Sequence, residues 1–180
     1  MNEVTAIELY EKARRLHERG KLSRAEQFYR KAIKTNKRFA PAHNNLGNML
    51  VDRNRLAEAT RAYQDALAHA PGDPRVLNNL GNVFHLRGKS KEAVSLLYTA
   101  LETDPDYLDA LNNLGNALSS LGRFNEATAV YHKAIQLAPN FAQLHLNLGR
   151  TLMDSGKLEF ASDSFTQAIT LDPNYAQAYY

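Results

Sequence analysis

The sequence repeats itself every 34 residues, and this period constrains the fold more than any other feature. A fixed period between about 20 and 50 residues is typical of a solenoid, in which each unit buries its apolar face only against its neighbours. The sequence therefore predicts stacked copies of one small unit. The recurring residues are Leu46-Gly47, Leu80-Gly81, Leu114-Gly115 and Leu148-Gly149; Pro71, Pro105, Pro139 and Pro173; Ala25, Ala59, Ala93, Ala127 and Ala161; and Ala32, Ala66, Ala100, Ala134 and Ala168.

Each unit is predicted to contain two helices. The fourth unit illustrates this, because its leucines recur with helical spacing on one face: Leu111, Leu114, Leu118 and Leu121. Gly122 follows, and glycine readily adopts the positive φ that ends a helix. A second apolar stripe then begins, with Ala127, Tyr131, Ala134 and Ile135. The fold class predicted by this alternation is all-α.

The units can be delimited by taking Ala6 as the first position. They are then expected at residues 6–39, 40–73, 74–107, 108–141 and 142–175, and a sixth first helix is expected to begin at 176–180. No linker or low-complexity segment separates the units. Residues 1–180 are therefore predicted to form a single domain.

The pattern resembles the tetratricopeptide repeat (TPR), a family with a Leu-Gly pair in the first helix, a small residue and an aromatic in the second, and a Pro near the end. The fourth unit has these as Leu114-Gly115, Ala127, Tyr131 and Pro139. The resemblance implies a right-handed α-solenoid of helix-turn-helix repeats whose first helices line a concave groove. It also implies a non-catalytic role in holding an extended peptide or a partner segment. The usual Trp of the motif is absent, and other residues occupy its place: Leu9, His43, Leu77, Leu111 and His145.

The residues give no indication of catalysis. The chain has no cysteine, which excludes disulfides, zinc–thiolate sites and a Cys nucleophile. No two of its six histidines lie three or four residues apart, and no phosphate-binding glycine motif is present. Tyr63, Tyr131 and Phe165 are interpreted as core residues. We therefore expect a protein that is not an enzyme and that has no cofactor and no metal site.

Charge and hydropathy limit the classes of partner that the sequence predicts. The net charge is +3 with both signs interspersed, and the longest basic cluster, Lys34–Arg38, is interpreted as a solvated loop. The sequence thus predicts no nucleic-acid partner. No apolar run is long enough to span a membrane, and the first residues do not match a signal peptide. Without such signals, a cytoplasmic location is the default expectation.

Asparagine is concentrated in three copies of one motif. LNNLGN occurs at 77–82 and 111–116, and HNNLGN at 43–48. In a helix interior, Asn costs about 0.5–0.7 kcal/mol relative to Ala, so its repeated use requires a reason. At about 100° per residue, the three asparagines of each copy lie on one side of the helix, and the first and third are i, i+4 neighbours.

Stacking the units would align these amides into a ladder on the surface that the resemblance identifies as concave. A primary amide offers two donors and an acceptor, so it can pair with a peptide backbone whatever the side chains are. The ladder resembles the asparagine rows in the TPR domains of the O-linked N-acetylglucosamine transferase and of kinesin light chain. The predicted peptide-binding residues are Asn44, Asn45, Asn48, Asn78, Asn79, Asn82, Asn112, Asn113, Asn116 and Asn147, with Arg14, Arg75 and Arg150 adding charge selection.

Two roles remain open for these asparagines. The second and third Asn of each copy are also common in the family motif, so contacts between adjacent helices are an alternative to binding. The first Asn of each copy, at Asn44, Asn78 and Asn112, is less expected from the family pattern. A binding role is favoured there, because the sequence shows no packing contact that would offset the loss of helix propensity.

Two other functions also remain open. The final AQAYY matches the start of a further first helix with no second helix after it. This pattern is consistent with the N-terminal, substrate-recruiting region of a larger enzyme, such as a glycosyltransferase. It is equally consistent with a self-assembling scaffold, because an uncapped apolar C-terminal end could stack on another copy and form a homo-oligomer.

Overall fold

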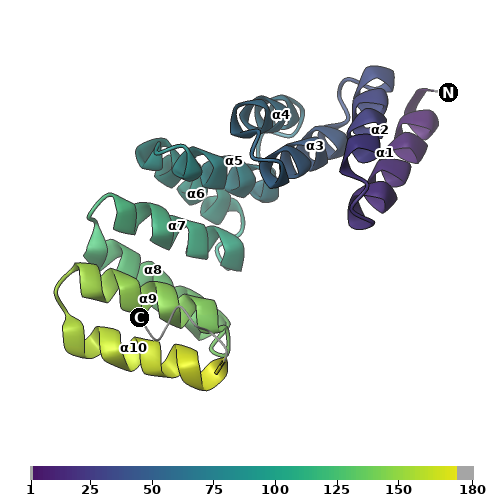
Figure 1. Cartoon of the computed structure of the whole chain (residues 1–180). Coiled ribbons are helices and arrows are strands. Elements are labelled where there is room, and N and C mark those ends of the chain that lie inside the picture. Colours follow the sequence, from purple (N-terminus) through teal and green to yellow (C-terminus); the bar gives the residue numbers. More distant parts are fainter. Residues whose placement is uncertain (1, 174–180) are drawn as a thin grey trace. The chain divides into compact units, whose positions relative to one another are not determined.

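The computed structural model describes residues 2–173, and all regular structure within them is α-helical (Figure 1). The ten helices of this range are α1 (Asn2–Glu18), α2 (Leu22–Thr35), α3 (Ala40–Asp52), α4 (Leu56–His69), α5 (Pro74–Leu86), α6 (Ser90–Thr103), α7 (Leu108–Ser120), α8 (Phe124–Leu137), α9 (Ala142–Asp154) and α10 (Leu158–Leu171). The predicted all-α class is confirmed. The sixth first helix, expected at residues 176–180, lies outside the described residues.

The helices begin and end where local sequence signals lie. Helices α3, α5, α7 and α9 start at the residues with which the second to fifth predicted repeats begin. Asp73 caps α5, because its carboxylate accepts a hydrogen bond from the backbone N–H of Arg75, and Pro74 is the first helical residue. Between the two helices of the fourth repeat, Gly122 has a φ of +72°, as predicted. In the second repeat, Asn54 takes the same role with a φ of +57°.

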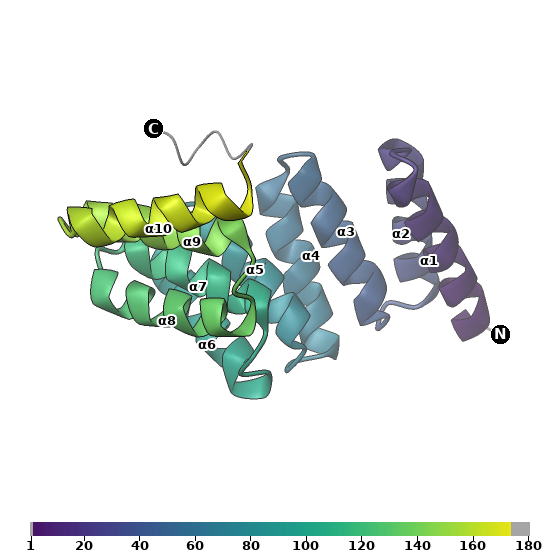
Figure 2. The same cartoon turned by 90° about the horizontal axis from the view of Figure 1, so that it is seen from below.

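The chain divides into two compact units, with the division between Arg87 and Gly88. The first contains α1 to α5 and the second α6 to α10 (Figures 1 and 2). In the first unit, α1 packs on α2, α2 on α3, α3 on α4, and α4 on α5. In the second, the same succession runs from α6 to α10. First helices of adjacent repeats also touch, since α1 contacts α3, α3 contacts α5, and α7 contacts α9. Within each unit the predicted solenoid of helix pairs is confirmed, whereas the assignment of residues 1–180 to a single domain stays a prediction.

The repeated Leu-Gly pair explains how the two helices of a repeat approach each other. The leucine is buried, and the glycine leaves room for an aromatic ring from the second helix. A Cβ added at Gly47 would lie 2.5 Å from the ring of Tyr63. Equivalent approaches pair Gly115 with Tyr131 and Gly149 with Phe165, each at 2.5 Å.

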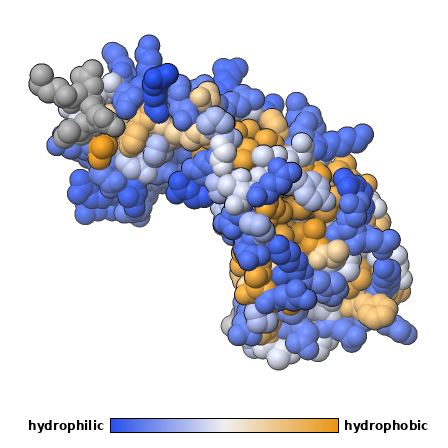
Figure 3. All heavy atoms as spheres, turned by 180° about the vertical axis from the view of Figure 1, so that it is seen from behind, coloured by the Kyte–Doolittle hydropathy of each residue, from blue (hydrophilic) through white to orange (hydrophobic). Residues whose placement is uncertain are grey.

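The aromatic residues expected in the core are found there. Tyr63 and Tyr131 are fully buried, and Phe165 packs against the buried pair Leu146 and Ala168. The ten alanines that recur in the second helices are all buried as well, which brings neighbouring helices close together. On the face shown in Figure 3, hydrophilic side chains and apolar side chains are both exposed.

Candidate functional site

In the first unit, all of the predicted binding asparagines except Asn82 are joined by hydrogen bonds. Asn45 Nδ2 donates to the hydroxyl of Tyr10 at 2.9 Å, and Asn44 Nδ2 donates to Asn45 Oδ1 at 3.2 Å. From the next repeat, Asn79 Nδ2 lies 3.1 Å from Asn44 Oδ1 and 3.0 Å from Asn48 Oδ1. The amides therefore connect α1, α3 and α5, which are successive first helices.

The second unit repeats this arrangement. Asn147 Nδ2 on α9 donates to Asn112 Oδ1 on α7 at 2.9 Å, and Gln143 Nε2 donates to Asn147 Oδ1 at the same distance. On α8, the hydroxyl of Tyr131 donates to Asn116 Oδ1 at 2.7 Å. First helices of adjacent repeats and the two helices of one repeat are thus joined through side-chain amides.

Each position of the motif has its own partners. The second Asn of one copy reaches back to the first Asn of the preceding copy, as Asn79 does to Asn44. The first Asn therefore has an intramolecular contact that the sequence did not show. Burial also favours a structural role, since Asn78 is only 4% exposed and Asn147 only 8%. These contacts support the structural alternative at both positions, and a ligand-binding role for them stays a prediction.

The third Asn keeps an unused donor. Asn48 Oδ1 accepts from both Tyr63 and Asn79, but within residues 2–173 its Nδ2 donates to no acceptor. The same holds for the Nδ2 groups of Asn82, Asn112 and Asn116. In this range, no buried side-chain nitrogen or oxygen is left without a partner, so these donors reach the surface. Asn113 is half-buried and has its own partner.

The three predicted arginines differ in how they are held. Arg14 is exposed and pairs on its own helix with Glu11 at 3.3 Å and Glu18 at 3.5 Å. Arg75 pairs with the capping Asp73 at 3.0 Å, although its side chain is largely exposed. Arg150 is exposed and contacts no carboxylate in the described part of the chain. Of the three, Arg150 is therefore the one whose charge is uncompensated.

The histidines in the place of the family's Trp bond to the backbone. His43 Nε2 donates to the carbonyl of Lys37, and His145 Nε2 donates to that of Pro139, both at 2.9 Å. Lys37 and Pro139 occupy the same position of the repeat, so the two histidines fix the same turn. Residues 2–173 contain no group of three His, Asp or Glu side chains arranged to hold a metal ion.

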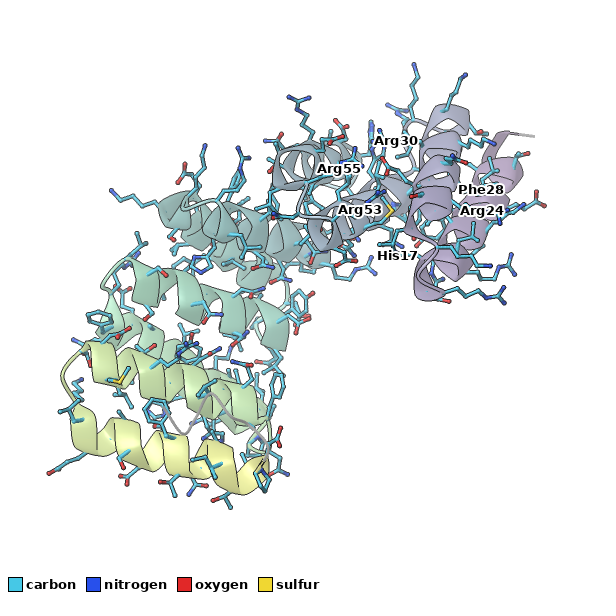
Figure 4. The ribbon with its side chains drawn as sticks, viewed as in Figure 1. His17, Arg24, Phe28, Arg30, Arg53 and Arg55 are labelled. Atoms are coloured by element: carbon cyan, nitrogen blue, oxygen red, sulfur yellow. The ribbon has the colours of Figure 1, made fainter. Side chains whose placement is uncertain are left out.

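An ionic cluster around Glu26 was not predicted from the sequence. Its carboxylate, which is 15% exposed, accepts from Arg30 at 2.8 Å, from Arg53 at 2.9 Å and from Arg55 at 2.9 Å. Figure 4 shows the three arginines together, Arg30 on α2 and the others in the turn between α3 and α4. Burial raises the pKa of Glu26, but hydrogen bonds from Arg30 and Arg55 outweigh burial and hold this pKa below its ordinary value.

The sequence carried a faint signal for this cluster. In the second repeat, the two arginines flank Asn54, the residue that replaces the usual turn glycine. The cluster joins the first repeat to the second, so its evident role is structural.

No helix within the described residues combines the length and apolar character needed to cross a lipid bilayer.

Comparison with known families finds three tetratricopeptide repeat models that match consecutive parts of the chain: residues 44–107, 108–141 and 142–175. A comparison with curated proteins finds no match. Among solved structures, YrrB, described as a TPR protein with an unusual peptide-binding site, is 26% identical, with a TM-score of 0.80, covering 97% of this chain and 90% of that chain.

Two further structures show the same fold. MamA of AMB-1 is 27% identical with a TM-score of 0.81, covering 92% of this chain and 98% of that chain. PilF of Pseudomonas aeruginosa is 21% identical with a TM-score of 0.85, covering 98% of this chain and 81% of that chain.

Proposed function

The chain belongs to the tetratricopeptide repeat family, and on that premise we propose that it is a non-catalytic module that binds an extended peptide segment of a partner protein. The described peptide-binding site of YrrB, which is 26% identical, supports a ligand of this class. In this proposal the first helices of each unit provide the binding surface, through their amides and through Arg150.

The unused amide donors carry the proposal. Asn48 and Asn82 in the first unit, and Asn112 and Asn116 in the second, each present an Nδ2 group that no acceptor within residues 2–173 takes up. A peptide carbonyl is a suitable acceptor for such a group. Neighbouring helices pack about 8–10 Å apart, which is about three residues of extended chain. In the first unit, Asn48 on α3 and Asn82 on α5 would therefore meet peptide carbonyls about three residues apart.

The arrangement also predicts how the site keeps its geometry. Asn48 Oδ1 is held by Tyr63 and Asn79, and Asn116 Oδ1 is held by Tyr131, so the orientation of each amide is fixed before a ligand arrives. A preorganised donor loses little side-chain entropy on binding. Recognition through backbone carbonyls would give a loose sequence preference.

A peptide-array screen with the full chain would identify the best ligand, and isosteric Asn→Asp variants would then test the mechanism. The double change Asn48→Asp with Asn82→Asp removes both Nδ2 donors while keeping an acceptor oxygen for Tyr63. We expect Kd to rise by about tenfold or more, since each lost hydrogen bond contributes about 0.5–1.5 kcal/mol. The melting temperature should change little.

The matched control is Gln136→Glu with Gln167→Glu, which adds the same charge on exposed positions of second helices. If the Asn variant and the control bind the ligand equally well, the amide mechanism is wrong. Asn112→Asp extends the same test to the first asparagine of a copy, because its Nδ2 is also unused.

Self-assembly is a second candidate function, favoured by one observation. On α10, Leu158 is 66% exposed and Phe160 is 64% exposed. Phe160 stands at a position where the second, third and fourth repeats have Glu58, Glu92 and Glu126. Light scattering over a dilution series should show a dimer or larger species that Phe160→Glu dissociates. A strict monomer at high concentration would eliminate this candidate.

If the chain recruits substrates to a larger enzyme, it would still bind peptides through the same site. Sequencing the gene beyond the codon for Tyr180 tests this role directly. A downstream catalytic region would support it.

A further inference from the structure

A cleft of about 630 Å³ opens on the first unit between α2, α3 and α4. It lies apart from the amide network, because none of the asparagines or arginines predicted to bind peptide lines it. Its position brings together two second helices, α2 and α4, over the side of α3 that carries His43 and Leu46. The cleft is thus a separate feature of the first two repeats.

The floor of the cleft is apolar. Leu46 and Leu50 of α3 and Ala62 of α4 are buried there, and Ile33 of α2 is half-buried beside them. Leu46, Leu50 and Ala62 belong to the packed helix pair of the second repeat, and Ile33 comes from the first repeat. Such a surface accepts an apolar side chain, because burying one there removes its apolar area from water at about 25 cal/mol per Å².

The rim of the cleft is basic. Lys34, Lys37 and Arg61 are exposed, and no carboxylate in the described part of the chain pairs with them. Two of these belong to Lys34–Arg38, the longest basic cluster of the sequence. The sequence alone indicates a solvated loop there, whereas the structure places Lys34 in α2 and makes both lysines part of the cleft.

Of the two carboxylates that line the cleft, Glu58 is engaged and Asp65 is exposed. Both oxygens of Glu58 accept from Arg55 at 2.7 Å, and these bonds hold the pKa of Glu58 below its ordinary value. Asp65 Oδ2 lies 3.8 Å from Nδ1 of His43, beyond hydrogen-bond distance, and its side chain is 64% exposed. Its negative charge is outnumbered by those of Lys34, Lys37 and Arg61, so the net charge of the rim is positive.

We propose that this cleft is a second docking site, which binds an acidic peptide segment of a partner protein anchored by one apolar side chain. The apolar residue would sit on the floor beside Ile33 and Leu46, and flanking Asp or Glu side chains would face Lys34, Lys37 and Arg61. The positive rim favours a ligand with acidic side chains. The apolar floor favours a ligand that also carries an apolar side chain over one that is only charged. A nucleic acid fits less well, because its phosphates need many cations and gain nothing from an apolar floor.

Fluorescence anisotropy with the full chain tests this inference. The probe is a fluorescein-labelled peptide that alternates Glu and Asp with Leu, and a matched peptide carries Ser in place of every Leu. We expect the first peptide to bind with an affinity that falls as salt is added, because the charges at the rim are exposed. The Ser peptide should bind at least about tenfold more weakly. Equal binding of the two peptides would overturn the role of the floor.

Charge reversal on the rim provides the second arm. Lys34→Glu with Lys37→Glu and Arg61→Glu should weaken binding of the Leu-containing peptide by about tenfold or more. The control reverses three exposed cations elsewhere in the same unit: Arg15→Glu, Arg19→Glu and Lys21→Glu. Thermal melts establish that both variants are folded. If the two triple variants lose affinity equally, net charge rather than the cleft explains binding, and the proposal fails.

Two further measurements separate this site from the alternatives. The Asn48→Asp, Asn82→Asp variant should bind this probe as the unchanged protein does, and a large loss would place the probe at the amides instead. A single-stranded oligonucleotide should not displace the peptide at an equal concentration of charge. Displacement would overturn the proposal in favour of a nucleic-acid site.

Discussion

The hydroxyl of Tyr131 donates a 2.7 Å hydrogen bond to Oδ1 of Asn116, while the ring of Tyr131 fills the space that a Cβ on Gly115 would occupy. One tyrosine thus explains two residues of the motif, the Gly and the Asn that follows it. Tyr63 does the same for Gly47 and Asn48, again with a 2.7 Å bond.

The fifth repeat changes both partners together. Phe165 has no hydroxyl, and Arg150 stands in place of the third Asn, whereas Gly149 keeps its close approach to the ring. The glycine therefore serves the packing of the ring, and the Asn serves the hydroxyl. This separation of roles leads to the first two predictions.

Gly47→Ala should destabilise the protein by about 1–3 kcal/mol, because the new methyl group would lie 2.5 Å from the buried ring of Tyr63. The control is Gly72→Ala, since a Cβ at Gly72 meets no atom within 4 Å. Urea unfolding followed by circular dichroism measures both. Equal midpoints for the two variants would show that the ring can move aside without loss.

A double-mutant cycle on Tyr131→Phe and Asn116→Ala should give a coupling energy of about 0.5–1.5 kcal/mol, the usual contribution of one hydrogen bond. The measurement is the free energy of unfolding of the two single variants and the double variant. Additive single effects would mean that the 2.7 Å bond contributes nothing to stability.

Asn147→Ala should lower the free energy of unfolding by about 1–3 kcal/mol, because the variant removes the hydrogen bonds that the buried Asn147 amide makes with Asn112 Oδ1 and Gln143 Nε2. The control is Asn125→Ala, an exposed residue that accepts only from Lys157 at 3.2 Å. This control should stay within about 0.5 kcal/mol of the unchanged protein. A similarly small effect at Asn147 would argue against a structural role for the amide network.

Glu26→Gln should destabilise the protein at neutral pH by about 1–3 kcal/mol, because the neutral amide replaces a carboxylate that accepts from three arginines. The pKa of Glu26 is lower in the folded state than its ordinary value of 4.5. Its ionised form therefore adds stability above the unfolded-state pKa, and this stability is lost as the pH falls through the folded-state pKa.

Thermal melts between neutral pH and pH 2 test this linkage. The difference between the unchanged protein and Glu26→Gln should shrink with acidification. Glu126→Gln serves as the control, because Glu126 is exposed and pairs with Arg123 alone, and it should have a much smaller effect at neutral pH. A difference that stays constant with pH would assign the effect of Glu26 to packing rather than to its charge.

The fold could be predicted almost entirely from the sequence, because the signals that define it are local. The apolar spacing of Leu111, Leu114 and Leu118 specifies a helix face, and Gly122 marks the turn that follows. Packing between the Leu-Gly pair and the aromatic of the second helix could be inferred because both recur in a fixed register. Periodicity then extends one repeat to the rest of the chain.

The candidate site was only partly predictable. A helical wheel groups the three asparagines of each copy on one side of their helix and places Asn78 with the surface residues, whereas that residue is 4% exposed. The wheel considers one helix alone, so it cannot show what a neighbouring element covers. The cleft rimmed by Lys34 and Arg61 was missed for the same reason, since its walls come from separate helices.

The all-α class, the 34-residue repeat and the apolar face of each helix could be read from the amino-acid sequence, because they follow from spacings within a few turns of chain. The pairing of the side-chain amides, in contrast, depends on how the helices stack. Asn79 reaches Asn44, and Asn147 reaches Asn112, across 35 residues of sequence, and the bond exists only because the stacked helices bring the two amides within about 3 Å. That stacking also determines which amide N–H groups stay unused. The asparagines of LNNLGN, which look equivalent in the sequence, are therefore divided into structural residues and candidate binding residues.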